Sequence, residues 1–112
     1  MAKPYTAFTE WMKQQGFVPE HKFHPVRRWR MDYAHIERMI CLEIQGGLWI
    51  TGRHNTGAGM TKDFEKFNAA TLLGWTLIFC TPAMVKSGEA CHLVSEILKD
   101  KRINLKDKRI NA

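Results

Sequence analysis

Hydrophobic residues recur every three to four positions in three parts of the chain, and this spacing predicts three amphipathic helices. Thr6 and Thr61 stand where the first two helices would begin, and a glycine follows each of these two segments. Pro82 occupies the first turn of the third. The predicted helices therefore cover residues 6–15, residues 62–73 and the segment from 82 onward.

Segments rich in branched and aromatic residues lie between these helices and predict strands. Residues 29–35 alternate in polarity, whereas 38–45 and 75–80 are mostly apolar. The first two strands would form a hairpin through the polar residues around His35 and Glu37. Residues 19–25 are expected to be extended or looped, and a further short strand at 48–51 would open the glycine-rich loop 46–59. The predicted order, α-β-β-(β)-α-β-α, is typical of the α/β class.

The 112 residues suit a single domain, and 17 Lys and Arg against 11 Asp and Glu give a net charge of +6. Such a balance favours a polyanionic partner. No apolar run is long enough for a membrane span, and the N-terminus lacks the core of a signal peptide, so we expect a cytosolic protein that does not bind membranes. The cysteines, Cys41, Cys80 and Cys91, are unclustered, which favours reduced core thiols over disulfides or zinc.

The end of the chain contains a tandem repeat. The heptad LKDKRIN occupies residues 98–104 and again 105–111. Its second copy offers few apolar residues for burial, so we divide the chain into a domain at 1–100 and a basic tail at 101–112. That tail would add non-specific attraction to phosphates.

Two acidic residues interrupt the strands of the predicted hairpin. Asp32 lies in WRMDYAH and Glu43 in CLEIQ, and on antiparallel neighbours their side chains can converge. Converging carboxylates repel unless they are protonated or bridged by a cation, and their oxygens suit Mg²⁺ or Mn²⁺. The carbonyl of Ile44 is a further ligand candidate, and Gln45 would face the same site. In the alternative interpretation, the two acids form separate salt bridges with the nearby arginines.

Asp32, ten intervening residues and then Glu43-Ile44-Gln45 resemble the PD-(D/E)XK nuclease pattern, with glutamine at the usual lysine position. The wider context is RWRMDYA, CLEIQGGLW, GRH, the helix DFEKFNAATLLGW and a strand that ends at Thr81-Pro82. Residues 20–85 together resemble small phage and bacterial endonucleases related to very-short-patch repair endonucleases and Holliday junction resolvases. This resemblance implies a restriction-endonuclease-like αβββαβ core with a small mixed sheet flanked by helices.

The resemblance also implies roles for individual residues. Asp32 and Glu43 would hold one or two Mg²⁺ or Mn²⁺ ions against the scissile phosphate. Gln45 cannot act as a base because an amide does not titrate near neutrality, but it can orient water or supply a carbonyl oxygen. The proton would pass to His54, bulk water or a phosphate oxygen. Glu20 either extends the acidic cluster or is a solvated loop residue.

Basic residues flank this acidic pair on both sides and are candidates for contacts with DNA phosphates. Three arginines precede Asp32, one lies in the glycine-rich loop, and two lysines lie on the following helix. These DNA-binding candidates are Arg27, Arg28, Arg30, Arg53, Lys62 and Lys66.

The sequence thus leads to the hypothesis of a metal-dependent DNA endonuclease. By analogy with the family, its substrate would be branched DNA such as a Holliday junction, in recombination or repair, and a homodimer would provide one site for each strand. If phage-encoded, it would work in the cytosol of a bacterial host. The alternative is a DNA-binding or assembly module that keeps the fold without catalysis.

Overall fold

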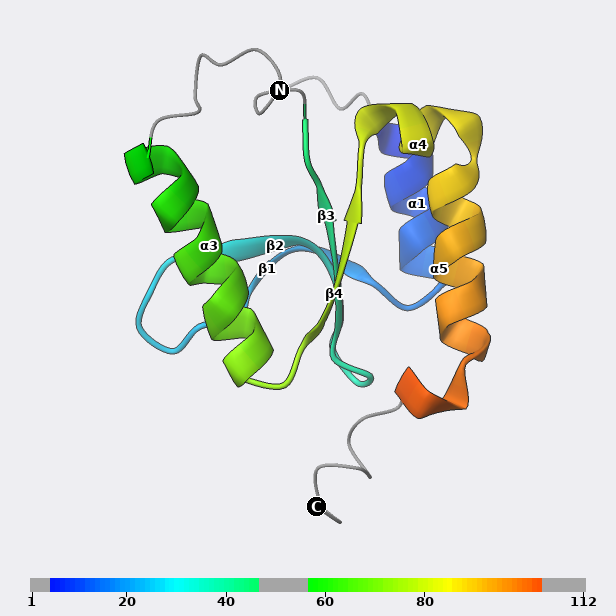
Figure 1. The fold of residues 1–112 in the computed structure, drawn as a ribbon. Coiled ribbons are helices and arrows are strands. Elements are labelled where there is room, and N and C mark those ends of the chain that lie inside the picture. The colour runs from blue at the N-terminus through cyan, green and yellow to red at the C-terminus, as the bar shows by residue number, and fades with distance from the viewer. Residues whose placement is uncertain (1–4, 47–56, 104–112) are drawn as a thin grey trace.

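A four-stranded sheet lies between two layers of helices in the computed structural model, which describes residues 5–46 and 57–103 (Figure 1). Neighbouring strands are antiparallel in the β1–β2 and β2–β3 pairs and parallel in the β3–β4 pair. The protein is therefore an α/β protein with a small mixed sheet, as the sequence predicted. In order across the sheet, the strands are β1 (Val18–Lys22), β2 (Arg30–His35), β3 (Ile40–Ile44) and β4 (Thr76–Cys80).

The helices are divided unequally between the two faces of the sheet. Among the helices of the described residues, α3 lies against one face, whereas α1, α4 and α5 lie on the other side (Figure 1). A short 3₁₀ helix, η1, follows α5. Their bounds are α1 (Thr6–Gln14), α3 (Gly57–Leu72), α4 (Pro82–Ser87), α5 (Glu89–Lys99) and η1 (Lys101–Ile103).

Each face of the sheet has its own buried cluster because successive residues of a strand point to opposite sides. On β3, Leu42 belongs to the cluster with residues of α1 and α5, including Met12 and Val94. Its neighbour Cys41 belongs to the smaller cluster with Ala70 of α3 and with Trp75. The same alternation turns Glu43 toward α3, so the candidate site lies on the α3 face.

The three strands before α3 include one that the sequence did not identify as a strand. β1 occupies part of the segment 19–25, which was expected to be extended or looped, and its sequence VPEHK lacks a hydrophobic alternation. Because β1 is an edge strand of this sheet, it tolerates a proline and alternating exposure. The predicted strand at 48–51 lies outside the described residues.

Two predicted helix boundaries were wrong. Helix α3 begins at Gly57, so Thr61 is not its N-cap but lies inside it, where its hydroxyl donates a hydrogen bond to the Gly57 carbonyl at 2.7 Å. The single third helix is in fact two, because Gly88 adopts a left-handed conformation (φ 89°) that ends α4 and starts α5.

A single arginine connects the β2–β3 turn with the end of α5. The guanidinium of Arg38 donates hydrogen bonds to the carbonyls of Leu98 at 2.7 Å and Asp100 at 3.1 Å. These contacts satisfy carbonyls at the C-terminal end of the helix, where a cation is favoured. Beyond η1, residues 104–112 of the predicted tail lie outside the described part. None of the helices described has the length and apolarity that crossing a membrane requires.

Candidate functional site

Asp32 and Glu43 face each other across the β2–β3 pair. The register joins Tyr33 to Leu42 and Ala34 to Cys41, so the next position along the strands places Asp32 opposite Glu43. In an antiparallel hairpin, residues directly opposite each other point to the same face of the sheet, so both acidic side chains lie on one face. The structure therefore brings together the two residues that the sequence singled out.

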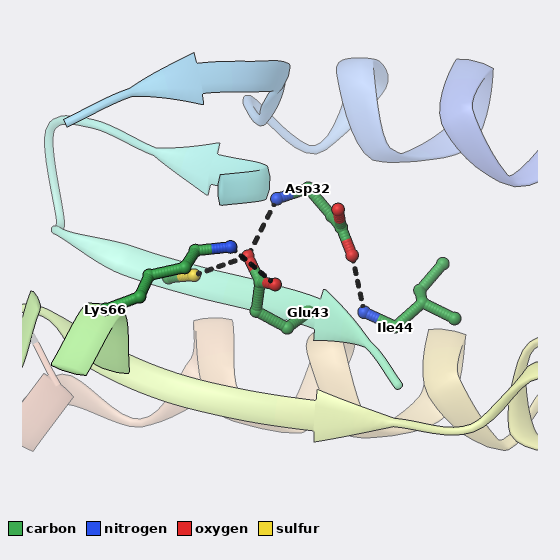
Figure 2. Close-up of polar contacts among 5 residues, drawn as sticks. Asp32, Glu43, Ile44 and Lys66 are labelled. Atoms are coloured by element: carbon green, nitrogen blue, oxygen red, sulfur yellow. Dashed lines mark hydrogen bonds and ion pairs between the residues drawn. The ribbon is translucent and has the colours of Figure 1, made fainter. Parts of the chain in front are cut away.

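Each of the two carboxylates accepts a hydrogen bond from the backbone of the other strand (Figure 2). The Glu43 Oε2 atom accepts from the N–H of Asp32 at 2.9 Å, and the Asp32 Oδ2 atom accepts from the N–H of Ile44 at 2.8 Å. The last residue pair of the regular β2–β3 register is Tyr33 with Leu42. Beyond it the carboxylates link the strands, so both acidic side chains are held in defined positions.

A lysine from α3 completes the cluster. The Nζ atom of Lys66 lies 3.1 Å from the Glu43 Oε1 atom, and the side chains are only 18% and 4% exposed (Figure 2). Lys66 precedes the buried Ala70 by one helical turn, so it lies on the helix face that packs against the sheet. Glu43 therefore has one oxygen toward the backbone of β2 and the other toward this ammonium group.

The surroundings disfavour the charged forms of both acids. Burial raises the pKa of Glu43, and the negative charge of Asp32 raises it further, although the ammonium of Lys66 acts in the opposite direction. Burial likewise raises the pKa of Asp32, against the lowering effects of the Ile44 N–H and of Lys66. Two carboxylates facing one ammonium leave one uncompensated negative charge when both are ionised. Such an excess of negative charge favours the binding of a cation.

The raised pKa of Glu43 makes a prediction about stability and pH. Because the folded state holds this proton more tightly than the unfolded state, Glu43 adds to stability below its ordinary pKa of 4.5, and this addition is lost as pH rises through the raised pKa. Urea unfolding should therefore be measured for wild type and Glu43→Gln between pH 4.5 and 8. As pH falls, the free energy of unfolding of wild type should rise relative to that of the variant. A stability difference that stays constant with pH would contradict the shift.

Three further predicted metal or catalytic positions, Ile44, Gln45 and Glu20, lie beside the acidic pair. Ile44 ends β3, and the N–H of Gln45 donates to the Cys80 carbonyl at 2.8 Å, which extends the contact of this segment with β4. Glu20 lies opposite Asp32 in the β1–β2 register, and its charge contributes to the raised pKa of Asp32 after the larger effect of burial. Glu20 is exposed and lies 3.8 Å from Arg30.

The basic residues do not pair with the site carboxylates in the way the alternative interpretation required. Arg27 forms an ion pair with Glu65 at 3.9 Å, and Arg30 pairs with Glu20. Glu43 is instead paired with Lys66, so the proposal of separate arginine salt bridges for the two acids is wrong. Arg28 and Lys62 are exposed. The remaining candidates, Arg53 and His54, lie outside the described residues.

The oxygen donors of the site suit a hard divalent cation with few protein ligands. Within residues 5–46 and 57–103 there is no group of three or more His, Cys, Asp or Glu side chains that could hold a metal ion. Mg²⁺ commonly uses one or two carboxylates, keeps several waters and binds substrate phosphates as well. Two carboxylates on neighbouring strands with uncompensated charge fit this requirement, and they do not fit a zinc or calcium cage of protein ligands.

Lys66 at the acidic pair is the main feature that sequence reasoning missed. The sequence predicts a contact with DNA phosphates for this lysine, without a position relative to Glu43. Only its helical spacing from Ala70 indicated that it faces the sheet, and that signal needs α3 to be docked on the β3 face. A second missed feature is the packing of the Arg27 guanidinium over the Trp29 ring, 4.0 Å from its centroid.

Comparison of this chain with protein-family models, curated proteins and solved structures gave no match in any of the three.

Proposed function

We propose that this protein is a divalent-metal-dependent DNA endonuclease that hydrolyses phosphodiester bonds. The observation that carries the proposal is the convergence of Asp32, Glu43 and Lys66 from three elements on one face of the sheet (Figure 2). An acidic pair on adjacent strands and a lysine nearby are the groups that the PD-(D/E)XK resemblance calls for. The mixed four-stranded sheet between helices is consistent with that resemblance.

Asp32 and Glu43 would hold Mg²⁺ or Mn²⁺, with the Ile44 carbonyl as a further ligand. When bound, the metal supplies a more acidic water and offsets the negative charge that develops on the phosphate. The backbone hydrogen bonds of both carboxylates fix their orientation before metal arrives, which lowers the cost of organising the site. Gln45 can orient the attacking water through its amide, and the proton would pass to bulk water, a phosphate oxygen or His54.

Lys66 offers the positive charge that a strand lysine would otherwise provide. Gln45 stands at that strand position, and an amide carries no charge. The ammonium of Lys66 already reaches Glu43 from α3, so a phosphate bound at the acidic pair would lie within reach of the same group. In this assignment Lys66 stabilises charge on the phosphate, while Lys62 and the arginines bind the DNA backbone further out.

Branched or otherwise structured DNA remains the proposed substrate, with a Holliday junction as the example to test. Its cleavage in both strands would need two sites, which a homodimer of this chain would provide. Both refinements rest on analogy with the resembled nucleases and are separate from the hydrolytic chemistry.

The Lys66–Glu43 pair also favours a second candidate, a DNA-binding or assembly module without catalysis. A buried carboxylate with an ammonium at 3.1 Å has a counter-ion of its own and does not require a metal for folding. In such a module, the acidic pair and Lys66 would serve only to join α3 to the sheet.

A nicking assay separates these candidates. We expect the full chain to convert supercoiled plasmid to nicked circles, and to cut a four-way junction, in Mg²⁺ or Mn²⁺ but not in EDTA. Crystals soaked with Mn²⁺ should show the ion between Asp32 and Glu43 with at least two waters. DNA binding without cleavage in either metal, together with no ion at this position, would favour the module.

A further inference from the structure

The loop between β1 and β2 carries a cluster of aromatic and basic side chains, formed by Phe23, His24, Arg27 and Trp29. The Phe23 and Trp29 rings are stacked, with centroids 6.2 Å apart and an interplanar angle of 14°. The His24 and Trp29 rings form a T-shaped pair with centroids 5.2 Å apart. The His24 Nδ1 atom also accepts hydrogen bonds from the N–H groups of Val26 and Arg27 at 3.1 and 2.9 Å. Side-chain contacts therefore define the shape of this loop.

Arg27 lies over the ring of Trp29 and is held there weakly. Its guanidinium carbon is 4.0 Å from the ring centroid, and its Nη2 atom is 3.9 Å from the Glu65 Oε1 atom. The side chains of Arg27 and Glu65 are 50% and 52% exposed. An ion pair and a cation–π contact in such exposed positions contribute little free energy, so Arg27 can leave the ring at small cost.

The position of the cluster connects it with the candidate site. Glu65, which pairs with Arg27, is adjacent on α3 to Lys66, which reaches Glu43. Arg28 and Arg30, both exposed, add cations to the same segment. The loop thus presents a planar aromatic surface surrounded by positive charges, beside the helix that also completes the acidic pair.

Such a combination suits a nucleotide whose base is not stacked in a duplex. Phosphates bind to arginines, whereas a base can stack on tryptophan only if one of its faces is free. In a continuous duplex both faces of each base are covered by its neighbours. The guanidinium that covers the Trp29 ring is itself half exposed, and the neighbouring Val26 is 81% exposed, so this part of the loop is open to solvent.

We infer that the Phe23–His24–Arg27–Trp29 cluster binds one unpaired base of a DNA strand beside the cleavage site. The base stacks on Trp29 in the place of the Arg27 guanidinium, and Arg27 moves from Glu65 to the adjacent phosphate. This inference rests on the proposed nuclease function and deepens it: the substrate class becomes DNA with unpaired nucleotides next to the scissile bond.

Binding measured without metal tests the inference independently of catalysis. In the full chain carrying Glu43→Gln, fluorescence anisotropy with labelled single strands and duplexes of the same length should show a preference that depends on Trp29. Trp29→Leu should weaken single-strand binding about tenfold and duplex binding less than about twofold. Trp29→Phe should retain much of the preference. Arg28→Ala is the matched control, expected to weaken both DNAs alike, since a phosphate contact does not distinguish them.

A second variant tests the exchange of Arg27 between its partners. Glu65→Gln removes one of the two partners of Arg27 and should strengthen single-strand binding several-fold. Glu10→Gln is the control, because it removes the same charge from an exposed pair with Lys13 on α1, and it should strengthen binding less. Equal losses for single strand and duplex in Trp29→Leu, or no single-strand binding, would overturn the inference. If wild type cuts duplex and gapped DNA equally in Mg²⁺, the inference fails while the nuclease proposal stands. If the preference is found without any cleavage, the nuclease proposal fails and only the binding of an unpaired base by the cluster stands.

Discussion

Glu43→Gln is expected to lower the rate of metal-dependent cleavage by about 10³-fold, equivalent to about 4 kcal/mol of transition-state stabilisation. The change removes one of two charged metal ligands but keeps the shape of the side chain. A glutamine carbonyl can still accept the hydrogen bond from the Asp32 N–H that Glu43 accepts at 2.9 Å. We therefore expect DNA affinity in EDTA to be unchanged or slightly higher, since a negative charge has been lost. Single-turnover nicking and anisotropy measure the two effects separately.

Glu20→Gln is the matched control because it makes the same chemical change at the residue opposite Asp32 in the neighbouring strand pair. Glu20 is exposed and paired with Arg30, so a role outside the metal site predicts a rate change of less than about threefold. A loss comparable to that of Glu43→Gln would instead place Glu20 at a second metal. Cleavage unaffected by Glu43→Gln would remove the assignment of the acidic pair.

The positions of the two acids were predictable because they depend on strand alternation and one local hairpin. Asp32 and Glu43 lie in segments with clear strand patterns, and a short turn between such strands makes them antiparallel neighbours. The sequence could therefore predict that the side chains share a face without predicting any distance. The backbone hydrogen bonds to the carboxylates were not predictable, because they depend on where the regular register ends.

Features that depend on the docking of α3 could not be predicted in the same way. Lys66 and Glu43 are 23 residues apart, and their contact requires a defined placement of the helix over β3. The Arg27–Glu65 pair has the same origin. A charged residue on a helix usually indicates a solvated face, and the spacing of Lys66 from Ala70 places it on the sheet side only once α3 is docked over β3. Strand β1 was missed for another reason: an edge strand with a proline and two charges gives almost no hydrophobic signal.

The break between α4 and α5 lies at Gly88, a residue type that can either end a helix or be tolerated inside one. Gly88 lies within a long apolar-periodic segment, and glycine inside a helix pattern is tolerated at a cost of about 1 kcal/mol relative to alanine. The apolar spacing on both sides of Gly88 accordingly predicts one continuous helix. In the structure the glycine takes φ 89°, and the hydroxyl of Ser87 accepts a hydrogen bond from the N–H of Glu89 at 3.2 Å. Two short helices then pack where one was expected.

Lys66→Met should lower both the free energy of unfolding and the rate of DNA cleavage. Divalent metal should restore the stability but not the cleavage rate. At pH 8 the change leaves the Glu43 carboxylate, 4% exposed, without its counter-ion, so we expect a loss of about 3 kcal/mol in the free energy of unfolding. The loss should shrink as pH falls through the raised pKa of Glu43, because a protonated carboxyl needs no ammonium partner. Urea unfolding at pH 8 and pH 5 measures the loss in the free energy of unfolding at each pH. Lys62→Met is the control, because Lys62 is exposed one turn earlier on α3. It should change the free energy of unfolding by less than about 0.5 kcal/mol at either pH.

Manganese distinguishes a catalytic Lys66 from a purely structural one. If the acidic pair is a metal site, Mn²⁺ replaces the missing positive charge, so it should raise the melting temperature of Lys66→Met by more than that of wild type. Cleavage by the variant at saturating Mn²⁺ should still be about 100-fold slower, because the ammonium that stabilises charge on the phosphate is absent. Restored stability together with wild-type cleavage would show that Lys66 only holds α3 to the sheet. A melting temperature insensitive to Mn²⁺ in both proteins would mean that Asp32 and Glu43 do not bind a metal, and the nuclease proposal would fall with them.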